Sequence, residues 1–596
     1  MNKLHMGINL GHDRSVSVVS QGKILVSIEQ ERLDRIKHSV GFTYQSPGEM
    51  RHIQAPSEGI RYCLDMLDVS FGDMETITAN MPGVDFGPEI MRGVLSRDIA
   101  KKVQTVPGHH LAHAYSAYWP SGFDEALVLA VDASGLTERK GSGWETESYS
   151  LYAGHGTSLN PLHAEGVQAH LAQLSTLGFV YEYIARKAGF ETRVNSGLSF
   201  PESGKLMGLA AYGGPQPSWE RWFRTREDSM SLEISAYDIF LEVEALEKKY
   251  DTGEGKAYFR PWLVDLAFKV QEELERALCH IVEVARKETG LNRLCIAGGI
   301  GLNSVANYKI LTQCGLDDIF IFPAAGDNGI SAGCAYWAYA TIEQGAERPR
   351  IETATLGKPR SGEEIREAVE KFDDLVVVER QNHENMVRKV AKALADGHIV
   401  ARFEGGCESG PRALGHRSIL ADPAFLRMKD VINARVKFRE AFRPFAPFVS
   451  LERANEVFKL ETESPFMLLV AEIRKEFHSV LPSITHADGT GRVQTCTKEA
   501  NRFFHELCHA VEDLRQGPPV LLNTSFNVAG QPIVETPEQA IETFLKTDID
   551  YLALEDCWIC RKHTPVKSYE DHVADLVDEE LPACLLYTSP SPRDRG

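Results

Sequence analysis

Residues Met6–Val19, MGINLGHDRSVSVV, read as an apolar strand, a small polar turn and a second apolar strand. Gln21-Gly22 then makes a tight turn into a third strand-like segment, residues 23–28. A turn built from glycine and short polar side chains lets backbone N–H groups approach a phosphate. One such turn is weak evidence for a phosphate-binding site, but the pattern recurs along the chain, and the repetition strengthens the prediction.

Three later segments repeat the combination of an apolar strand and a polar or glycine-rich turn: ALVLAVDASG at 126–135, RLCIAGGIGLN at 293–303 and FIFPAAGDNG at 320–329. Two phosphate-facing hairpin turns followed by a glycine-rich adenosine loop resemble the ATPase fold of actin, Hsp70 and sugar kinases. Any one of these loops alone would read as an ordinary α/β turn. Together they predict an α/β fold with an actin/Hsp70-like ATPase domain, with Gly298, Gly299 and Asn303 near the nucleotide.

A histidine pair follows a break in the chain. In PGHHLAHA, residues 107–114, the Pro-Gly step precedes an alanine-rich helix. His109 and His113 are four residues apart, so on that helix they share a face, whereas His110 points elsewhere. Asp132 and Asp327, at the acidic turns, can complete the ligand set of a divalent transition metal. The alternative is a surface helix that is merely rich in histidine.

The segment ESGKLMGLAAYG, residues 202–213, opens a helix with small residues. Its Gly-Lys pair invites comparison with a P-loop, but the upstream glycine spacing and a following Ser or Thr are both missing. Two interpretations stay open. Lys205 lies near the nucleotide and Gly208 allows close approach, or the segment is simple packing.

The second half of the chain concentrates arginines in loops. After a linker within residues 346–362, a strand at 399–404 runs into GGCESGPRALGHRS, residues 405–418. KFREAFRPFAP at 437–447 and GRVQT at 491–495 add further cations, and the strand VLLNTSFN at 520–527 ends in amides and hydroxyls. Because guanidinium groups pair bidentately with oxyanions, these clusters in an acidic chain predict a phosphate or carboxylate pocket. Solvated surface arginines are the alternative for any single residue.

Length and charge exclude several classes of protein. At 596 residues the chain is too long for one hydrophobic core, so two or more domains are expected. A net charge of -20 argues against non-specific binding to nucleic acid or to an anionic membrane, whose phosphates would repel the chain. No apolar run approaches the roughly 20 residues that span a bilayer, and the N-terminus is too short and polar for a signal peptide.

The 11 cysteines are scattered, which indicates a reduced, cytoplasmic protein rather than a disulfide framework. The close pair Cys557 and Cys560 lacks a second pair of soft ligands nearby, which favours packing within a strand over a zinc site. The last residues, LLYTSPSPRDRG at 585–596, match no helix or strand and read like translated adapter or cloning DNA.

Motifs spread along nearly the whole chain resemble the NodU/CmcH-type O-carbamoyltransferases. That family acts on nodulation factors, cephalosporins, ansamycins, aminoglycosides and saxitoxin-type alkaloids. The most specific motif is GPRALGHRS at 410–418. The others follow in order at His12-Asp13, 29–38, 109–113, 297–299, 442–447, 492–494 and 523–527.

The resemblance implies a Kae1-like ATPase domain over residues 1–355, a YrdC-like α/β domain over 356–567 and a tail over 568–596. Carbamoyl phosphate would be cleaved in the YrdC-like domain. The carbamate would then react with ATP in the Kae1-like domain to give carbamoyladenylate, which carbamoylates a hydroxyl.

The same resemblance assigns roles to single residues. A divalent metal, Fe²⁺ first and Mg²⁺ as the alternative, would be held by His109, His113, Asp132 and Asp327. Carbamoyl phosphate would be bound by Arg412, His416, Arg443, Arg492 and Asn523. The adenylate would meet the acceptor hydroxyl at His12, Asp13 and Lys37. His12 is the expected general base, since the unperturbed pKa of imidazole lies close to working pH.

Three other functions share some of these features. A tRNA threonylcarbamoyl transferase uses the same two domain types, but the net charge of -20 and the lack of a basic stripe disfavour a tRNA partner. An Hsp70-class scaffold would leave the histidine pair and the arginines without a purpose. A metabolite kinase would release ADP and would not need the second domain. The acceptor, an antibiotic or a saxitoxin-type alkaloid, and the oligomeric state, with a homodimer as one option, stay open.

Overall fold

A computed structural model of the chain describes residues 3–46, 49–80, 102–141, 143–169, 175–194, 198–251, 253, 256–343 and 347–576. The segment 585–596, predicted to be a cloning remnant, lies outside the described residues. The chain forms two compact units, residues 1–351 and 352–596. Within the described residues, no helix combines the length and the apolar character that crossing a membrane requires.

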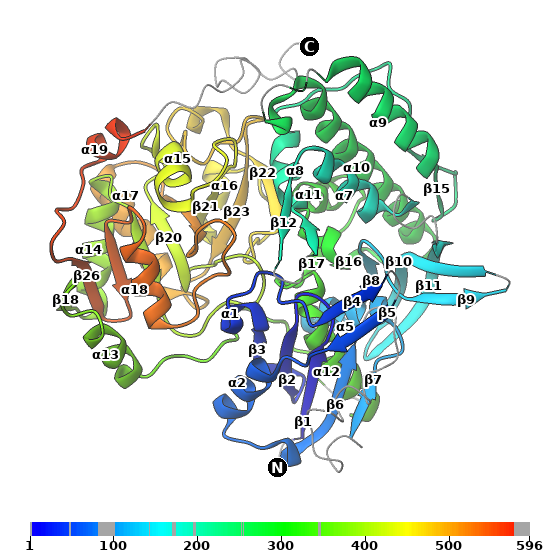
Figure 1. Ribbon diagram of the computed structural model, residues 1–596, viewed down its shortest axis with the longest axis horizontal. Coiled ribbons are helices and arrows are strands. Elements are labelled where there is room, and N and C mark those ends of the chain that lie inside the picture. The colour runs from blue at the N-terminus through cyan, green and yellow to red at the C-terminus, as the bar shows by residue number, and fades with distance from the viewer. Residues whose placement is uncertain are drawn as a thin grey trace. The chain divides into compact units, whose positions relative to one another are not determined.

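The larger sheets of the first unit share one topology (Figure 1). In one sheet the strand order is β3-β2-β1-β6-β7, where β2 and β3 form an antiparallel meander with β1, and β6 and β7 run parallel to it. The other sheet repeats this arrangement in the order β11-β10-β8-β16-β17, with β9 paired to β10. This repeated order is that of the actin/Hsp70-like ATPases and confirms the predicted fold class.

The strands of the first sheet are β1 (Leu4–Asn9), β2 (Ser15–Ser20), β3 (Lys23–Glu29), β6 (Met74–Asn80) and β7 (Val103–Thr105). Those of the second are β8 (Glu125–Val131), β9 (Thr137–Lys140), β10 (Gly143–His155), β11 (Ser158–Gln168), β16 (Arg293–Ala297) and β17 (Asp318–Ile321). The segments quoted above at 6–19 and 126–135 therefore start equivalent sheets, and the turns that follow β1 and β8 are equivalent too.

Two helices connect these sheets. Helix α5 (His109–Ser121) follows the first sheet but packs on β8 and β16 of the second, whereas α12 (Ile330–Ile342) follows the second sheet and packs on β1, β2 and β6. The helices also pack on each other at very short range, because a Cβ atom on Gly333 would lie 1.9 Å from the carbonyl oxygen of Ala112. This contact fixes the start of α5 against the turn before α12.

The remaining helices of the first unit are α1 (Gln30–Asp34), α2 (Ser57–Leu67), α7 (Leu177–Lys187), α8 (Ser203–Ala210), α9 (Ala236–Tyr250), α10 (Pro261–Thr289) and α11 (Ser304–Gln313). Short hairpins are formed by β4 (Phe42–Ser46) with β5 (Glu49–Ile53), β12 (Glu191–Arg193) with β13 (Ser199–Pro201), and β14 (Phe223–Thr225) with β15 (Leu232–Ile234). Helix α10 packs against α7, α8 and α11, so these helices form one layer beside the second sheet.

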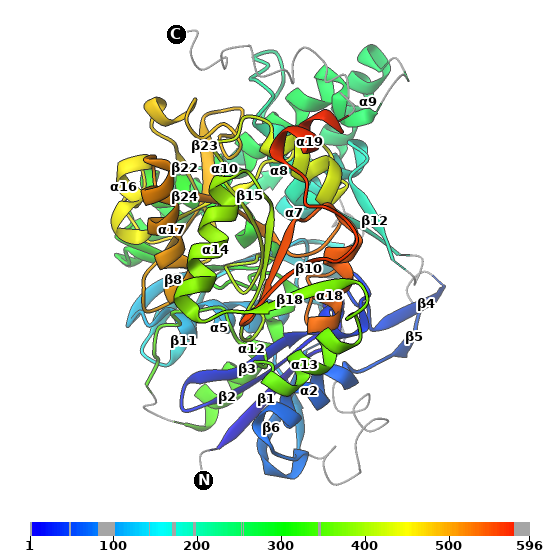
Figure 2. The same ribbon diagram turned by 90° about the vertical axis from the view of Figure 1, so that its left-hand side faces the viewer.

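The second unit is built on one mixed sheet with the strand order β18-β26-β25-β19-β20-β24-β21-β23-β22. Helices α14 (His383–Ala395) and α17 (Arg502–Arg515) pack together along one face of it (Figure 2). Their apolar side chains join those of the sheet in one core. The unit is therefore α/β, and its likeness to YrdC stays an expectation. Cys557 and Cys560 lie within strand β26, in line with the predicted strand packing.

The strands of this sheet are β18 (Val376–Arg380), β19 (Val400–Phe403), β20 (Arg417–Ala421), β21 (Ala446–Ser450), β22 (Leu469–Glu472), β23 (Thr490–Cys496), β24 (Val520–Ser525), β25 (Tyr551–Leu554) and β26 (Cys557–Arg561). Its other helices include α13 (Gly362–Glu370), α15 (Met428–Val431), α16 (Ala454–Val457), α18 (Pro537–Leu545) and α19 (Tyr569–Ala574). The GPRALGHRS loop connects β19 to β20, next to β24 in the middle of the sheet.

Candidate active site

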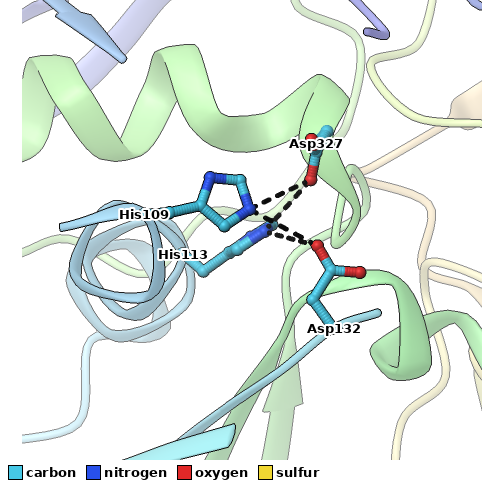
Figure 3. A group of neighbouring side chains, drawn as sticks. All are labelled: His109, His113, Asp132 and Asp327. Carbon is cyan, nitrogen blue, oxygen red and sulfur yellow. Dashed lines mark hydrogen bonds and ion pairs between the residues drawn. The ribbon is translucent and has the colours of Figure 1, made fainter. Parts of the chain in front are cut away.

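Four ligand-type side chains converge at one point of the first unit. His109 and His113 project from the first turns of α5, Asp132 follows β8, and Asp327 starts a 3₁₀ turn, η5 (Asp327–Gly329), before α12 (Figure 3). Asp132 Oδ2 lies 3.5 Å from His109 Nε2 and 3.3 Å from His113 Nε2. Asp327 Oδ1 lies 3.4 Å and 3.3 Å from the same two nitrogens. The four residues predicted as metal ligands are therefore neighbours.

The surroundings of this cluster suit a metal ion. The contacts of 3.3–3.5 Å are longer than normal charge-assisted hydrogen bonds, so the four side chains enclose a space between them. Asn80 Oδ1 lies 3.1 Å from His109 Nδ1 and thereby turns Nε2 toward the carboxylates. The backbone N–H groups of Ala133 and Gly299 donate to Asp132 Oδ1 at 2.8 and 3.1 Å, which leaves Oδ2 for an ion.

The charges of the cluster are strongly coupled. Burial alone would lower the pKa of His109, but the charge of Asp327 and the hydrogen bond with Asp132 outweigh burial and raise that pKa to about 10. Burial would raise the pKa of Asp132, yet His109 and His113 hold it well below its ordinary value. Burial and the positive charge of those two histidines lower the pKa of His110 to about 3. The two carboxylates thus attract positive charge, which protons or a divalent cation can supply.

His12 connects this cluster to the turn after β1. Its Nδ1 lies 2.8 Å from Asp13 Oδ2, and its Nε2 lies 3.3 Å from Asp327 Oδ2. The other oxygen of Asp13 lies 3.0 Å from His38 Nδ1. Burial would lower the pKa of His12, but the charge of Asp327 and the hydrogen bond with Asp13 raise it to about 10. A cation beside Asp327 would offset that carboxylate and lower the pKa of His12 toward the neutral form that a general base needs.

Lys37, the third residue predicted to be catalytic, is connected to Asp13 through Glu31 and His38. Its Nζ pairs with Glu31 Oε1 at 3.4 Å, and Glu31 Oε2 accepts the backbone N–H of His38 at 2.8 Å. The ring of Phe200 stacks on His38, with centroids 4.8 Å apart. His12, Asp13 and Lys37 are predicted from the sequence as catalytic residues, but His38 is not, although it follows Lys37 in the motif at 29–38. Its contact with Asp13 across the turn has no sequence signal.

The predicted nucleotide residues fall into two groups. Gly298, at φ 93°, and Gly299 end β16 beside the end of β8. A Cβ on Gly298 would lie 2.1 Å from the carbonyl oxygen of Val131, so position 298 tolerates no side chain. The side chain of Asn303 instead caps α11 by accepting from the N–H of Ala306, and it exchanges hydrogen bonds of 2.9 and 3.1 Å with Gln271.

Lys205 and Gly208 lie on α8, which packs against α10. The Lys205 ammonium pairs with Glu202 and lies 5.9 Å from the centroid of the Phe190 ring. Both the nucleotide and the packing interpretations of this helix stay predictions.

In the second unit, four arginines from three segments lie close enough for their charges to interact, and we call this cluster the arginine pocket: Arg412, Arg439, Arg443 and Arg492. Burial and the charge of Arg443 lower the pKa of Arg412 to about 10. Burial and the charges of the other three lower the pKa of Arg492 well below its ordinary value. The Nε atoms of Arg412 and Arg492 are buried without a hydrogen-bond partner among the described residues. Glu440 Oε2 lies 3.8 Å from an Arg443 guanidinium nitrogen and supplies one negative charge, so the four arginines keep an excess of positive charge that suits an anion.

Arg439 was missing from the predicted site, although it stands in the quoted segment 437–447. Its Nε donates to Asn433 Oδ1 at 2.7 Å, and its guanidinium lies 4.6 Å from the centroid of the Phe445 ring. The alternation of arginine and phenylalanine in this segment is the signal that could have identified it.

The loop that carries Arg412 is held in place by a buried carboxylate and two amides. Glu408 Oε1 accepts the backbone N–H groups of Leu414 and His416 at 2.7 and 2.8 Å. Asn523 Nδ2 donates to the carbonyl of Ala413 at 3.0 Å and to Gln494 Oε1 at 2.8 Å. Asn523 Oδ1 is buried and has no hydrogen-bond partner among the described residues, so it can accept one from a ligand.

His416, predicted to bind carbamoyl phosphate, has partners for both ring nitrogens. Nδ1 lies 3.0 Å from the carbonyl oxygen of Glu404, and Nε2 lies 3.4 Å from Asn501 Nδ2. These contacts connect the loop to the start of α17.

The regions that carry both clusters match one family. The family model of the carbamoyltransferase N-terminus matches residues 74–336, and that of the carbamoyltransferase C-terminus matches residues 391–561. The nodulation protein NolNO of Sinorhizobium fredii is 32% identical, over 100% of this chain and 87% of that protein. The chain belongs to the carbamoyltransferase family. Another member, 3'-hydroxymethylcephem-O-carbamoyltransferase of Amycolatopsis lactamdurans, is 26% identical over 92% of this chain and 98% of that protein.

Among solved structures, full-length HypF in the phosphate- and nucleotide-bound form is 14% identical, with a TM-score of 0.35 over 57% of this chain and 56% of that chain. In this carbamoyltransferase the four metal-type ligands lie within the N-terminal match, and the arginine pocket lies within the C-terminal match.

Proposed function

We propose that this carbamoyltransferase converts carbamoyl phosphate and ATP to carbamoyladenylate and then transfers the carbamoyl group to a hydroxyl of a small-molecule natural product. The observation that carries the proposal is the pairing of two sites with opposite preferences. One, in an actin/Hsp70-like unit, attracts a cation beside strand-end glycines. The other, in the second unit, attracts an anion.

In the second unit, the arginine pocket would bind the phosphate of carbamoyl phosphate, because guanidinium groups suit tetrahedral oxyanions. The unpaired Asn523 Oδ1 would accept a hydrogen bond from the carbamoyl NH₂ group. Water then adds to the carbamoyl carbon, and the bond from that carbon to the phosphate oxygen breaks. The products are carbamate and phosphate, and the arginines stabilise the charge of the departing phosphate.

In the first unit, an oxygen of carbamate attacks the α-phosphorus of ATP, and pyrophosphate leaves. The backbone at Gly298 and Gly299, which has room for no side chain, would face the nucleotide. A divalent metal ion held by His109, His113, Asp132 and Asp327, with Fe²⁺ the first candidate and Mg²⁺ the second, would supply positive charge beside the phosphates. The resulting anhydride makes carbamate a better electrophile, since AMP is a good leaving group.

The acceptor hydroxyl then attacks the carbamoyl carbon, and AMP leaves. Asp13 accepts the Nδ1–H of His12 and so orients the ring, which leaves Nε2 to take the proton of the hydroxyl. Lys37 pairs with Glu31, and His38 contacts Asp13, so both lie near the turn that carries His12. The Amycolatopsis relative is named for a hydroxymethyl group of a cephem, and antibiotics or saxitoxin-type alkaloids are the acceptors to test first.

The test is to incubate the protein with ATP, carbamoyl phosphate and either Fe²⁺ or Mg²⁺, without an acceptor, and to measure AMP, ADP and pyrophosphate. We expect AMP and pyrophosphate, both dependent on carbamoyl phosphate. The adenylate mechanism is wrong if ADP forms instead of AMP, or if ATP is cleaved equally well without carbamoyl phosphate. Formation of ADP would indicate a kinase-type reaction.

A further inference from the structure

A second set of metal-type ligands lies on the second unit, outside the arginine pocket. His505 and His509 are one turn apart on α17, and both face Glu452 in the 3₁₀ turn η7 (Leu451–Arg453). His505 Nε2 lies 2.7 Å and His509 Nε2 lies 3.1 Å from the same atom, Glu452 Oε1. The two imidazole centroids are 4.9 Å apart. One ligand atom of each residue lies within 4.8 Å of the other two.

A second carboxylate, that of Glu512, lies next to His509 on the side away from Glu452, as in many metal sites. His509 Nδ1 lies 3.5 Å from Glu512 Oε2, so its other nitrogen, Nε2, is the one that faces Glu452. Arg453 in turn holds both oxygens of Glu512, at 3.0 and 2.9 Å. A carboxylate behind a ligating histidine fixes the tautomer and the orientation of the ring, and it accompanies most histidine ligands in metalloproteins.

We propose that Glu452, His505 and His509 form a second metal site, which binds a divalent transition metal and fits Zn²⁺ best. Two imidazoles and one carboxylate are the ligands that Zn²⁺ prefers, whereas Mg²⁺ and Ca²⁺ select oxygen ligands. The side chains of Glu452, His505 and His509 are 49%, 17% and 34% exposed, so water can supply the fourth ligand. None of these residues takes part in the proposed reaction, and the inference does not depend on that reaction.

A metal ion at this place would fasten two segments that support the arginine pocket. Helix α17 packs on β21, and η7 directly follows that strand. Asn501 caps the start of α17, one turn before His505, and contacts His416 of the GPRALGHRS loop. An ion that binds the folded chain and not the unfolded chain stabilises the fold by mass action. The site is therefore a structural clip for the second unit.

The experiment measures Zn²⁺ stoichiometry and the zinc-dependent shift of the thermal midpoint in the full-length protein. The test variants are His509→Gln and Glu452→Gln. The matched control is His383→Gln, because His383 also pairs with a carboxylate, Glu506, at 2.8 Å. Its exposed fraction of 36% is similar to the 34% of His509, but it belongs to no group of metal-type ligands among the described residues. His113→Gln removes a ligand of the first cluster and separates the two sites.

We expect each test variant to bind one equivalent of Zn²⁺ fewer than the wild type, or to bind it at least tenfold more weakly, and to lose the corresponding thermal shift. His383→Gln should match the wild type, and His113→Gln should keep the second site. The proposal is overturned if both His509→Gln and Glu452→Gln keep the full stoichiometry and the full shift. Glu452→Gln decides the matter if His509→Gln does not fold, because Glu452 is half exposed.

Discussion

The guanidinium groups of the arginine pocket repel one another, and burial adds to the cost of their charge. The charge of Arg443 contributes to the lowered pKa of Arg412, Arg439 and Arg492 alike. A bound phosphate removes both penalties at once. Ligand binding and stability of the second unit are therefore linked, and removing a ligand-binding residue here should not destabilise the free protein.

We expect Arg492→Met to leave the thermal midpoint of the free protein unchanged or raised, because it removes one of four like charges and keeps an apolar stem of similar length. The same variant should lose the stabilisation by carbamoyl phosphate, which is about 2.7 kcal/mol at one hundred times the Kd. Thermal unfolding with and without the ligand measures both effects. The exposed Arg366→Met is the control. A destabilised Arg492→Met that still responds fully to the ligand would contradict this role.

The histidines of the first cluster make a prediction about protons. Because the pKa of His109 is about 10 in the metal-free protein, its imidazole is charged near neutral pH and must lose a proton to coordinate a metal. Metal binding should therefore release protons, and affinity should rise with pH until His109 is neutral. Calorimetry in buffers of different ionisation enthalpy measures the release. Affinity that does not change across the range from pH 6 to about 9 would show that the cluster is not a histidine-ligated site.

At the scale of the helices and strands, the first cluster depends on the contact between α5 and α12. His109 and His113 start α5, and Asp327 lies in the turn before α12, so a shift of either helix separates the ligands. The contact is tight at Gly333, where a Cβ would overlap the carbonyl oxygen of Ala112.

Gly333→Ala should cost about 1–3 kcal/mol of stability, as overpacked cores do, and should weaken metal binding although no ligand is changed. Gly204→Ala on α8 is the control, since a Cβ there meets nothing within 4 Å, and it should be neutral or slightly stabilising. Chemical denaturation and metal titration of both variants measure these effects. Equal metal affinity in the two variants would mean that the helix contact does not position the ligands.

Sequence patterns predicted the strands, the turns and the shared face of His109 and His113, since these follow from local periodicity. These patterns could not show which ring nitrogen of each histidine faces the carboxylates. Asn303 caps a helix and His416 holds a loop, and both use polar atoms that a binding role would also use. His38 reaches Asp13 across 25 positions of the chain, and a single sequence gives no periodic signal for such a contact. Arg439 instead contacts Asn433 and Phe445 within its own stretch of chain, so the alternation of arginine and phenylalanine there could have identified it.

The proposed reaction assigns its successive steps to the two compact units, residues 1–351 and 352–596, so each step should be separable by mutation. His113→Gln should keep the release of phosphate from carbamoyl phosphate but lose the formation of AMP. Arg492→Met should lose both, and it should still bind nucleotide. Measuring phosphate, AMP and nucleotide binding for each variant tests this division. Loss of phosphate release in His113→Gln would contradict it.

In the proposed reaction an oxygen of the carbamoyl group becomes bonded to the α-phosphorus of ATP. The measurement is to supply carbamoyl phosphate labelled with oxygen-18 at its carbonyl, together with ATP and an acceptor, and to weigh the AMP by mass spectrometry. Carbamate then carries the labelled oxygen and one oxygen from water, and either can attack the α-phosphorus. The labelled oxygen therefore enters the bridge of about half of the adenylate molecules and leaves with AMP when the acceptor attacks the carbamoyl carbon. We expect oxygen-18 in about half of the AMP, and AMP without any label would show that no carbamoyladenylate forms.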